Sequence, residues 1–305
     1  MNTKETCIAI NCPDYYREQS ASGGVFPRIA EQVLESGGYV AGAVYDDSHT
    51  LVYHTVTNQW DVVQQMRSSK YVHSHATRAF SKIAEILKED KTVLFTGCAC
   101  QCAVLKSYLK GKVSLNKLIT IDVICYGTPE PVVYASYINS LIEEHGPIKT
   151  VDFRRKSEFG WNCGLYIEFE NGETMSEGSE NPYLKGFLDG YIMCSSCHKC
   201  RFKSAKYSDM TIGDFWGIEQ LNKELADGKG TSLVELNTPR GYALFDQMLS
   251  SIPNQSLLPI QPAIENNLAL RQSLPEPPMR KHFFELFDSR KDDLSFWKMV
   301  KEEFK

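Results

Sequence analysis

The feature that most restricts this sequence is a run of closely spaced cysteines, Cys194, Cys197 and Cys200. Gaps of two residues let successive thiolates turn toward one metal centre, which suits either a tetrahedral zinc site or an iron–sulfur cluster. A bacterial ferredoxin run would continue with a fourth cysteine followed by proline, whereas Cys200 is followed by Arg201 and Phe202. At least one more ligand must therefore come from a distant segment, and the fold has to bring that segment to the run.

The composition favours a globular metal or redox protein. The chain has 305 residues, 42% hydrophobic and 23% charged, which is about two domains by length and excludes a disordered, collagen-like or coiled-coil protein. Its net charge of −5 argues against a nucleic-acid binder. No run of about 18 apolar residues would span a membrane, and residues 1–20 lack a secretion signal, so we expect a cytoplasmic protein. Ten cysteines in a reducing compartment indicate metal binding or redox chemistry.

Helical and strand patterns alternate in the first half of the sequence. An amphipathic helix at 24–36 is followed by a strand at 39–45, and the same alternation continues up to a helix at about 132–144. It predicts an α/β fold with a mixed or largely parallel sheet flanked by helices. Beyond about residue 149, a smaller β-rich part contains the cysteine run, and a helical C-terminal tail follows. We expect two regions, 1–148 and 149–305, although no linker marks the boundary.

Two cysteine-bearing segments, at 97–102 and 125–129, follow predicted strands. In parallel α/β sheets, ligands bind at the loops beyond the carboxyl ends of the strands. Cys100 and Cys125 are therefore natural partners for the cysteine run. Cys98, Cys100 and Cys102 alternate along one predicted loop and cannot easily all face one ion, so we expect one ligand among them and buried thiols at the others.

Two polar segments have the residues of a phosphate site. Ser20-Ala21-Ser22-Gly23-Gly24 opens a predicted helix, so hydroxyls, backbone amides and the positive end of the helix dipole converge there. Ser68-Ser69-Lys70-Tyr71-Val72 places a cation beside an aromatic ring in a polar stretch. Each pattern also occurs without a ligand, as a serine helix cap and as an exposed lysine.

These segments occur in the order found in a known family. The shared motifs are Arg17-x-x-Ser20-Ala21-Ser22-Gly23-Gly24, Ser69-Lys70-Tyr71-Val72, the segment 97–101, Cys125-x-Gly127, Asp152-Phe153-Arg154-x-Lys156, Ser196-Cys197-x-x-Cys200 and the segment 208–217. From about residue 15 to the C-terminal tail, the sequence resembles the beta subunits of coenzyme F(420)-reducing hydrogenases and related dehydrogenases. Relatives often carry an N-terminal ferredoxin segment, and the resemblance here covers the C-terminal catalytic region without it.

Such proteins are flavin and iron–sulfur oxidoreductases, so the resemblance implies FAD and a [4Fe–4S] cluster. Zinc becomes the minority alternative, with His198 as an additional ligand candidate. Matching motif by motif assigns the cluster to Cys100, Cys125, Cys197 and Cys200, with Cys194 in reserve. The FAD is expected to contact Ser20, Ser22, Gly23, Gly24, Ser69, Lys70, Tyr71, Gly97 and Gln101. The sequence departs from the family pattern at Cys98-Ala99, where relatives have Thr-Pro, and at Tyr126, where they have histidine; these changes leave the substrate undefined.

The resemblance implies an oxidoreductase that moves electrons between a deazaflavin or ferredoxin-like donor protein and an unidentified acceptor, either a small molecule or a protein. A deazaflavin would then be a co-substrate. A flavin accepts two electrons and can release them singly, while a [4Fe–4S] cluster carries one, so the two would form a relay. No catalytic acid or base is assigned. Two alternatives stay open: a zinc-stabilised, non-enzymatic binding protein, and an accessory subunit that passes electrons to a partner enzyme.

Overall fold

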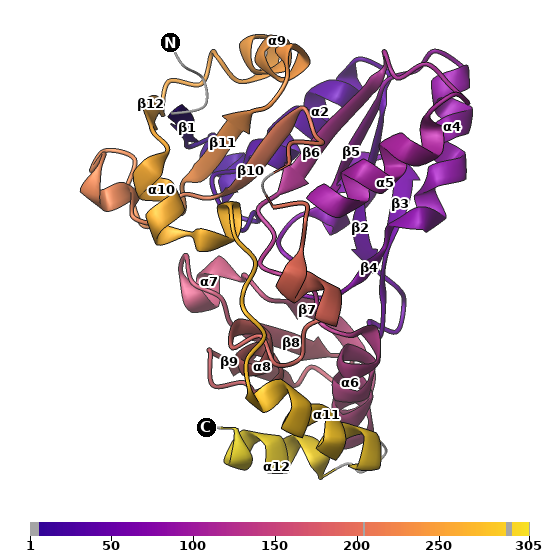
Figure 1. The fold of residues 1–305 in the computed structure, drawn as a ribbon, viewed down its shortest axis with the longest axis vertical. Coiled ribbons are helices and arrows are strands. Elements are labelled where there is room, and N and C mark those ends of the chain that lie inside the picture. The colour runs from indigo at the N-terminus through magenta and orange to yellow at the C-terminus, as the bar shows by residue number, and fades with distance from the viewer. Residues whose placement is uncertain (1–5, 204, 291–294, 305) are drawn as a thin grey trace.

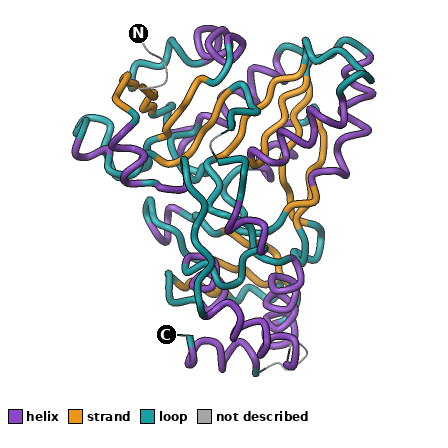
Figure 2. The backbone as a smooth tube through the Cα atoms, viewed as in Figure 1, coloured by secondary structure: helices purple, strands orange, loops and turns teal. Residues whose placement is uncertain are grey.

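The computed structural model describes residues 6–203, 205–290 and 295–304. Within these residues the strands form a nine-stranded sheet and a three-stranded sheet, with a belt of loops between them (Figures 1 and 2). The large sheet has the order β12-β1-β11-β10-β6-β5-β2-β3-β4, with these strands in turn: Gln255–Pro259, Thr6–Ile10, Ser232–Leu236, Met210–Asp214, Leu118–Val123, Val93–Cys98, Tyr39–Tyr45, Val52–Thr57 and Ser74–His75. The small sheet has the order β7-β8-β9: Ile148–Asp152, Leu165–Phe169 and Thr174–Glu177.

Strands in the middle of the large sheet share one direction. β10, β6, β5 and β2 pair in parallel, and β1 has the same direction because β1 and β10 both pair antiparallel with β11. The carboxyl ends of these strands therefore lie along one edge of the sheet, which we call the carboxyl edge. β3 is antiparallel to β2, and β4 is parallel to β3, so the chain also enters β4 from this edge.

Alternating side chains bury both faces of the large sheet. On β2, Val40 packs with one group of helices, whereas its neighbour Ala41 packs with the other. The first face is covered by α2 (Val25–Glu35), α3 (Trp60–Met66) and α9 (Pro239–Met248). The second is covered by α4 (Phe80–Lys88) and α5 (Ala99–Leu109), with α10 (Gln261–Asn266) near β1. Val25, Ile29 and Val33 repeat every four residues along α2, which gives that helix one apolar face.

The small sheet packs with helices against an aromatic core. These helices are α6 (Pro131–His145), α8 (Pro182–Leu188), α11 (Met279–Arg290) and α12 (Phe296–Glu303). Tyr134, Tyr183 and Phe283 are fully buried in this core, and Trp297 is nearly so. Asn181 begins α8 by accepting a hydrogen bond from the Leu184 N–H. In Figure 1 this layer lies below the large sheet.

The predicted fold class is confirmed: a large mixed sheet with a parallel centre is flanked by helices, a smaller sheet follows, and the chain ends in helices. Both expected regions, 1–148 and 149–305, contribute strands to the large sheet, because β10, β11 and β12 come from the second. The boundary at 148/149 stays a prediction. In the part of the chain that the structure describes, no helix is both long enough and apolar enough to cross a bilayer.

One local prediction was wrong. The segment 97–102 is not a loop, because β5 extends to Cys98 and α5 begins at Ala99. The Gln101 side chain accepts a hydrogen bond from the Cys98 N–H over 2.8 Å, and the Cys98 side chain completes a reciprocal helix cap. Cys100 and Cys102 therefore lie on the first turns of a helix.

His54 on β3 joins β4 and β5 from a buried position, with 2% of its surface exposed. Its Nε2 lies 2.8 Å from the Thr96 carbonyl oxygen, which can only accept, so Nε2 carries the proton. Its Nδ1 lies 2.7 Å from the Ser74 hydroxyl oxygen and accepts a hydrogen bond from it. Burial lowers the pKa of His54 from 6.5 to about 4. The folded protein therefore holds this histidine in its neutral form.

Acid is expected to destabilise the protein through His54. Between about pH 4 and 6.5 the unfolded chain binds more protons at this position than the folded protein does, so the free energy of unfolding falls as the pH drops through that window. The loss should reach up to about 3 kcal/mol. Urea unfolding at pH 7 and at pH 4.5 measures this loss of stability. The loss should be smaller in His54→Gln than in the wild type, and unchanged in the control His75→Gln, because His75 is exposed. An undiminished loss in His54→Gln would contradict this role.

Candidate functional site

The segments singled out in the sequence lie along the carboxyl edge of the large sheet. The turn at 20–24 follows β1, and the segment 67–73 leads into β4. The segment 97–101 comes at the end of β5, and Cys125 follows β6. The small sheet reaches the same edge, since the Ser68 hydroxyl donates to Asp152 over 2.9 Å. The edge that binds ligands in parallel α/β folds thus gathers segments from both ends of the chain.

Main-chain contacts bring the loop after β6 to the cysteine run. The Cys194 N–H donates to the Thr128 carbonyl over 2.8 Å, and Pro129 forms a β-bridge with Met193. A Cβ on Gly127 would lie 2.3 Å from Met193 Sδ, and the φ of +153° at this position is one that other residues rarely adopt, so glycine suits the close approach of the two segments. Cys125 therefore lies beside the run although about 70 positions separate them in sequence.

Six cysteines of intermediate exposure, whose thiols we call the thiol group, gather where these segments meet: Cys98, Cys100, Cys125, Cys194, Cys197 and Cys200. The pKa of the Cys100 thiol is raised to about 12, first by burial and then by the nearby thiolates of Cys125, Cys200 and Cys197. The Cys98 thiol donates a hydrogen bond to Cys125, which raises the pKa of Cys98 and lowers that of Cys125. Cys194 donates to Cys197 with the same effect.

Neighbouring residues hold the cysteine run on two sides. Thr128 Oγ1 lies 3.8 Å from Cys194 Sγ and 3.7 Å from Cys197 Sγ. On the other side, the Ser273 hydroxyl oxygen accepts a hydrogen bond from the Cys200 N–H over 3.0 Å. The run is thus placed by the loop after β6 and by the segment that leads into the C-terminal helices.

The thiol group is not already arranged around one point. Among the described residues, no set of three or more His, Cys, Asp or Glu side chains has the geometry of a metal site. The thiols instead interact as two pairs, Cys98 with Cys125 and Cys194 with Cys197, and the Cys194 thiol also lies 3.5 Å from the Pro129 carbonyl oxygen. Thiolates are the donors preferred by iron–sulfur clusters and by zinc, so this donor set fits either.

The turn at 20–24 is held by its own hydrogen bonds. The Ser22 hydroxyl donates to the Thr231 carbonyl over 2.8 Å, and the Gly23 N–H donates to the Ser232 hydroxyl over the same distance. A Cβ on Gly23 would lie 2.3 Å from the Ile10 carbonyl oxygen, so glycine is required where the turn passes β1. Within the described residues no side chain caps α2, which starts after this turn with its first N–H groups at the carboxyl edge.

Arg67 and Lys156 reach this turn, and Lys70 lies next to Arg67; none of the three forms an ion pair among the described residues. Arg67 donates to the Tyr16 carbonyl over 2.7 Å, and Lys70 Nζ donates to the Arg67 carbonyl over 3.0 Å. Lys156 Nζ donates to the Ser22 carbonyl over 2.9 Å. Burial lowers the pKa of each lysine to about 8. Asp152 acts electrostatically on Lys70, and Asp214 and Asp227 act on Lys156, so this positive region is compensated at a distance and not by direct ion pairs.

Arg154 connects the turn to the segment that contains Tyr71. It donates to Asp214 over 2.7 Å, to the Ala21 carbonyl over 2.9 Å and to the Tyr71 hydroxyl over 3.2 Å. Only 5% of the Arg154 side chain and 12% of Asp214 are exposed. Although burial alone would lower it, Asp214 and Tyr71 raise the pKa of Arg154, so the guanidinium stays charged. The Tyr71 ring stacks on Phe187, 4.6 Å away.

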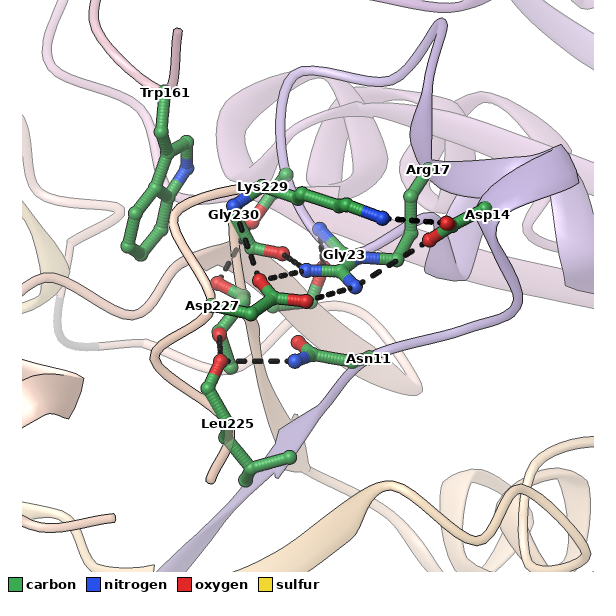
Figure 3. Close-up of polar contacts among 12 residues, drawn as sticks. Asn11, Asp14, Arg17, Gly23, Trp161, Leu225, Asp227, Lys229 and Gly230 are labelled. Atoms are coloured by element: carbon green, nitrogen blue, oxygen red, sulfur yellow. Dashed lines mark hydrogen bonds and ion pairs between the residues drawn. The ribbon is translucent and has the colours of Figure 1, made fainter. Parts of the chain in front are cut away.

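Arg17 fixes the other side of the turn (Figure 3). Its guanidinium binds both oxygens of Asp227, at 2.8 and 2.7 Å, and donates to the Gly230 carbonyl over 2.9 Å. An exposed ion pair between Lys229 and Asp14 lies beside it. The loop at 225–230 is thereby held against the turn.

A protein-family model matches the middle of the chain. Residues 90–253, more than half of the chain, match the family that comprises the C terminus of the beta subunit of coenzyme F420 hydrogenase/dehydrogenase. The chain belongs to this family. The family segment includes every cysteine of the thiol group, whereas the turn at 20–24 and Lys70 precede it.

The fold of this beta-subunit family member also matches a solved structure. A chain of the F420-reducing [NiFe] hydrogenase complex from Methanosarcina barkeri, studied by xenon derivatization, aligns with a TM-score of 0.55 and 16% sequence identity. The alignment covers 98% of this chain and 91% of that chain. At this identity the likeness establishes the fold. Among curated proteins, no sequence gives a significant match.

In this family member, the residues that the sequence assigned to a cluster lie together: Cys100, Cys125, Cys197 and Cys200, with the reserve Cys194 beside them. Their role as ligands stays a prediction. The residues assigned to FAD lie along the same edge, but several of their polar groups are already engaged. The Ser20 hydroxyl donates to the Tyr16 carbonyl, and Gln101 joins Cys98 to the Ser74 carbonyl. Ser69 is half-buried next to Ser68, and Gly97 makes room for Gln101.

Sequence reasoning missed several residues of the site. Arg67 and Lys156 received no role, although Arg67 directly precedes the polar segment with Lys70, and Lys156 ends a family motif. Cys98 was expected to be only a buried thiol, yet it forms a hydrogen bond with Cys125. No local pattern signals these contacts, because each joins segments that are distant along the chain.

Proposed function

We propose that this family member is a flavin- and [4Fe–4S]-dependent oxidoreductase that moves electrons between a deazaflavin or ferredoxin-type donor and an acceptor yet to be identified. The observation that supports this most is the convergence of the thiol group. Cys100 and Cys200 stand 100 positions apart in sequence, yet their thiols interact at the carboxyl edge. Family membership supports a redox role of the hydrogenase and dehydrogenase beta-subunit type.

Four cysteines would hold the cluster through sulfur: Cys100, Cys125, Cys197 and Cys200. The two remaining thiols, Cys98 and Cys194, would stay protonated and donate hydrogen bonds to ligand sulfurs, as they do to Cys125 and Cys197 here. Hydrogen bonds and positive charge near the sulfurs raise a cluster's reduction potential. Lys203, which acts electrostatically on Cys125 and Cys197, would add to this effect.

The positive region around the turn at 20–24 suits the pyrophosphate of FAD. The uncapped start of α2 supplies N–H groups, and Arg67, Lys70 and Lys156 supply positive charge that no direct ion pair neutralises among the described residues. Ser20, Ser22, Gly23 and Gly24 would shape this turn more than donate to the phosphates, since their hydrogen bonds point into the protein. Bound FAD would supply the exchange between two-electron and one-electron chemistry.

Cofactor analysis of freshly made, anaerobically purified protein tests the proposal. We expect iron, acid-labile sulfide and FAD, together with a brown colour and flavin absorbance. Stoichiometric zinc without iron would instead establish the zinc-stabilised binding protein. Turnover of a reduced deazaflavin with methyl viologen as acceptor, in the absence of other proteins, would separate an enzyme from an accessory electron-transfer subunit.

The affinity for FAD is expected to fall as the pH rises through about 8. Lys70 and Lys156 each have a pKa of about 8 without ligand, so at pH 9 only about one-tenth of each remains charged. Each lysine should thus weaken anion binding by up to about tenfold between pH 7 and 9. Fluorescence titration of the apoprotein with FAD measures this dependence.

Substitution of Lys156 isolates its part of that dependence. Lys156→Gln should bind FAD more weakly at pH 7 and show a shallower decline toward pH 9. Lys149→Gln is the matched control, because Lys149 is exposed on β7 and pairs with Glu168 away from the turn. Equal affinities of Lys156→Gln and the wild type at pH 7 would remove Lys156 from the proposed phosphate site.

A further inference from the structure

A basic segment without acidic residues follows the cysteine run. Residues 190–208 include no aspartate or glutamate, although the chain as a whole has a net charge of −5. The cations of this segment are Lys199, Arg201, Lys203 and Lys206. Positive charge is therefore concentrated next to the thiol group of an otherwise acidic protein.

Most of these cations are free to act on a partner. Lys199 and Arg201 are exposed, and neither forms an ion pair among the described residues. Lys203 Nζ donates only to the Ala269 carbonyl, over 3.3 Å. Lys206 differs, because it pairs with Glu235 at 2.6 Å, so its charge is compensated. The uncompensated charge thus belongs to Lys199, Arg201 and Lys203.

An aromatic pair lies within this group of cations. The rings of Phe202 and Tyr207 are 5.5 Å apart, and 41% of Tyr207 is exposed. The Arg201 guanidinium lies 5.3 Å from the centre of the Phe202 ring. Exposed aromatic residues with a charged rim are typical of surfaces that bind proteins. We call Lys199, Arg201, Phe202, Lys203 and Tyr207 the basic patch.

The basic patch adjoins the thiol group. Lys199 and Arg201 flank Cys200 in sequence, and Lys203 acts electrostatically on both Cys125 and Cys197. The six cysteines are each of intermediate exposure, and exposed Lys199 and Arg201 flank Cys200, so a redox centre held at Cys200 would lie near the surface at this point. A partner bound at the patch would therefore sit next to that centre.

We propose that the basic patch is the docking surface for a small acidic protein that carries a one-electron redox centre. This inference rests on the proposed function, and it assigns the protein partner to one face of the molecule. In the exchange, the reduced partner would lose one electron and a centre held by the thiol group would gain it, with no atom transferred. Because the rest of the chain is net negative, an acidic partner is repelled elsewhere and steered to this patch.

A binding measurement tests the surface without relying on turnover. The probe is a small acidic ferredoxin of the bacterial two-cluster type, titrated into the full-length, cofactor-containing protein by calorimetry at low ionic strength. The charge-reversed variant Lys199→Glu/Arg201→Glu should bind it at least about tenfold more weakly than the wild type does. Binding by the wild type should also weaken as salt is added.

A matched control keeps the same change in net charge. Lys88→Glu/Lys110→Glu alters two exposed lysines at the ends of α4 and α5, which lie at the edge of the large sheet opposite the carboxyl edge. This variant should bind the ferredoxin within about twofold of the wild type, because charges beyond a Debye length are screened. Equal weakening in both variants would show a general charge effect and overturn the docking surface.

The remaining outcomes also decide the proposal. If the wild type does not bind the ferredoxin, or if both charge-reversed variants bind as tightly as it does, the docking surface is wrong. Tight, patch-dependent binding of a single-stranded RNA in place of the ferredoxin would overturn it in favour of a nucleic-acid site. Dithionite-reduced methyl viologen can reduce the protein without any protein docking, so this reaction reports on the redox function separately. Failure of the redox function can therefore be distinguished from failure of the docking surface.

Discussion

The Cys197→Ser variant is expected to lose most of its protein-bound iron and the associated visible absorbance after anaerobic purification. Cys197 is a hydrogen-bond acceptor from Cys194 and lies within electrostatic reach of Cys100, so it is a central member of the thiol group. A serine hydroxyl is a much harder donor than a thiolate and holds iron–sulfur clusters poorly. Iron and sulfide assays, normalised to protein, measure the loss.

Two other cysteine variants make this result specific. Cys7→Ala should keep its full iron content, because Cys7 is 2% exposed in a separate apolar core with Phe215 and Leu233. Cys194→Ala should retain iron with a lower reduction potential, since it removes a hydrogen-bond donor to Cys197. Equal iron loss in the Cys7 and Cys197 variants would contradict the assignment, and complete loss in Cys194→Ala would move Cys194 from the reserve into the ligand set.

The Arg154→Met variant is expected to lower the free energy of unfolding by about 3–5 kcal/mol. Arg154 is buried and forms the 2.7 Å ion pair with Asp214, so its loss leaves a buried carboxylate without its counter-charge. It also removes the hydrogen bonds to the carbonyls of Ala21 and Trp161. Urea unfolding at pH 7 measures the change.

The neighbouring residue provides a matched control. Arg155→Ala should cost less than about 1 kcal/mol, because Arg155 is half-buried and its main contact is with the ring of Tyr166. In the double variant Arg154→Met/Asp214→Asn, the total cost should be smaller than the sum of the single costs, since no buried charge is then unpaired. Additive costs would show that the ion pair does not account for the effect.

The position of the site at the carboxyl edge follows from the direction of the strands. β1, β10, β6 and β5 all end there, so each connecting segment emerges next to the others. Buried, hydrophobic strands keep these ends in register, while the segments beyond them are free to carry polar and sulfur-containing residues. One edge of a rigid sheet can therefore position both the thiol group and the cation-lined turn.

Local patterns predicted much of this arrangement. The helix at 24–36 and the strand at 39–45 correspond to α2 and β2, because apolar spacing over a dozen residues reports directly on which side is buried. The junction at 97–102 was misassigned, since the cap that starts α5 at Ala99 depends on a side-chain hydrogen bond from Gln101. β1, β11 and β12 were not predicted, because short strands depend on distant partners for their pairing.

The order of residues along the chain was enough to predict the alternating fold, the cysteine run, the family and the segments that border the site. Which side chains meet at that site depends on how the chain packs in three dimensions. Cys98 lies against Cys125 because β5 and β6 pair in parallel, with Cys98 opposite Val123. Arg67 and Lys156 reach the turn at 20–24 because the chain returns to it before β4 and after β7. Contacts of this kind depend on packing between remote segments, which leaves no periodic trace along the chain.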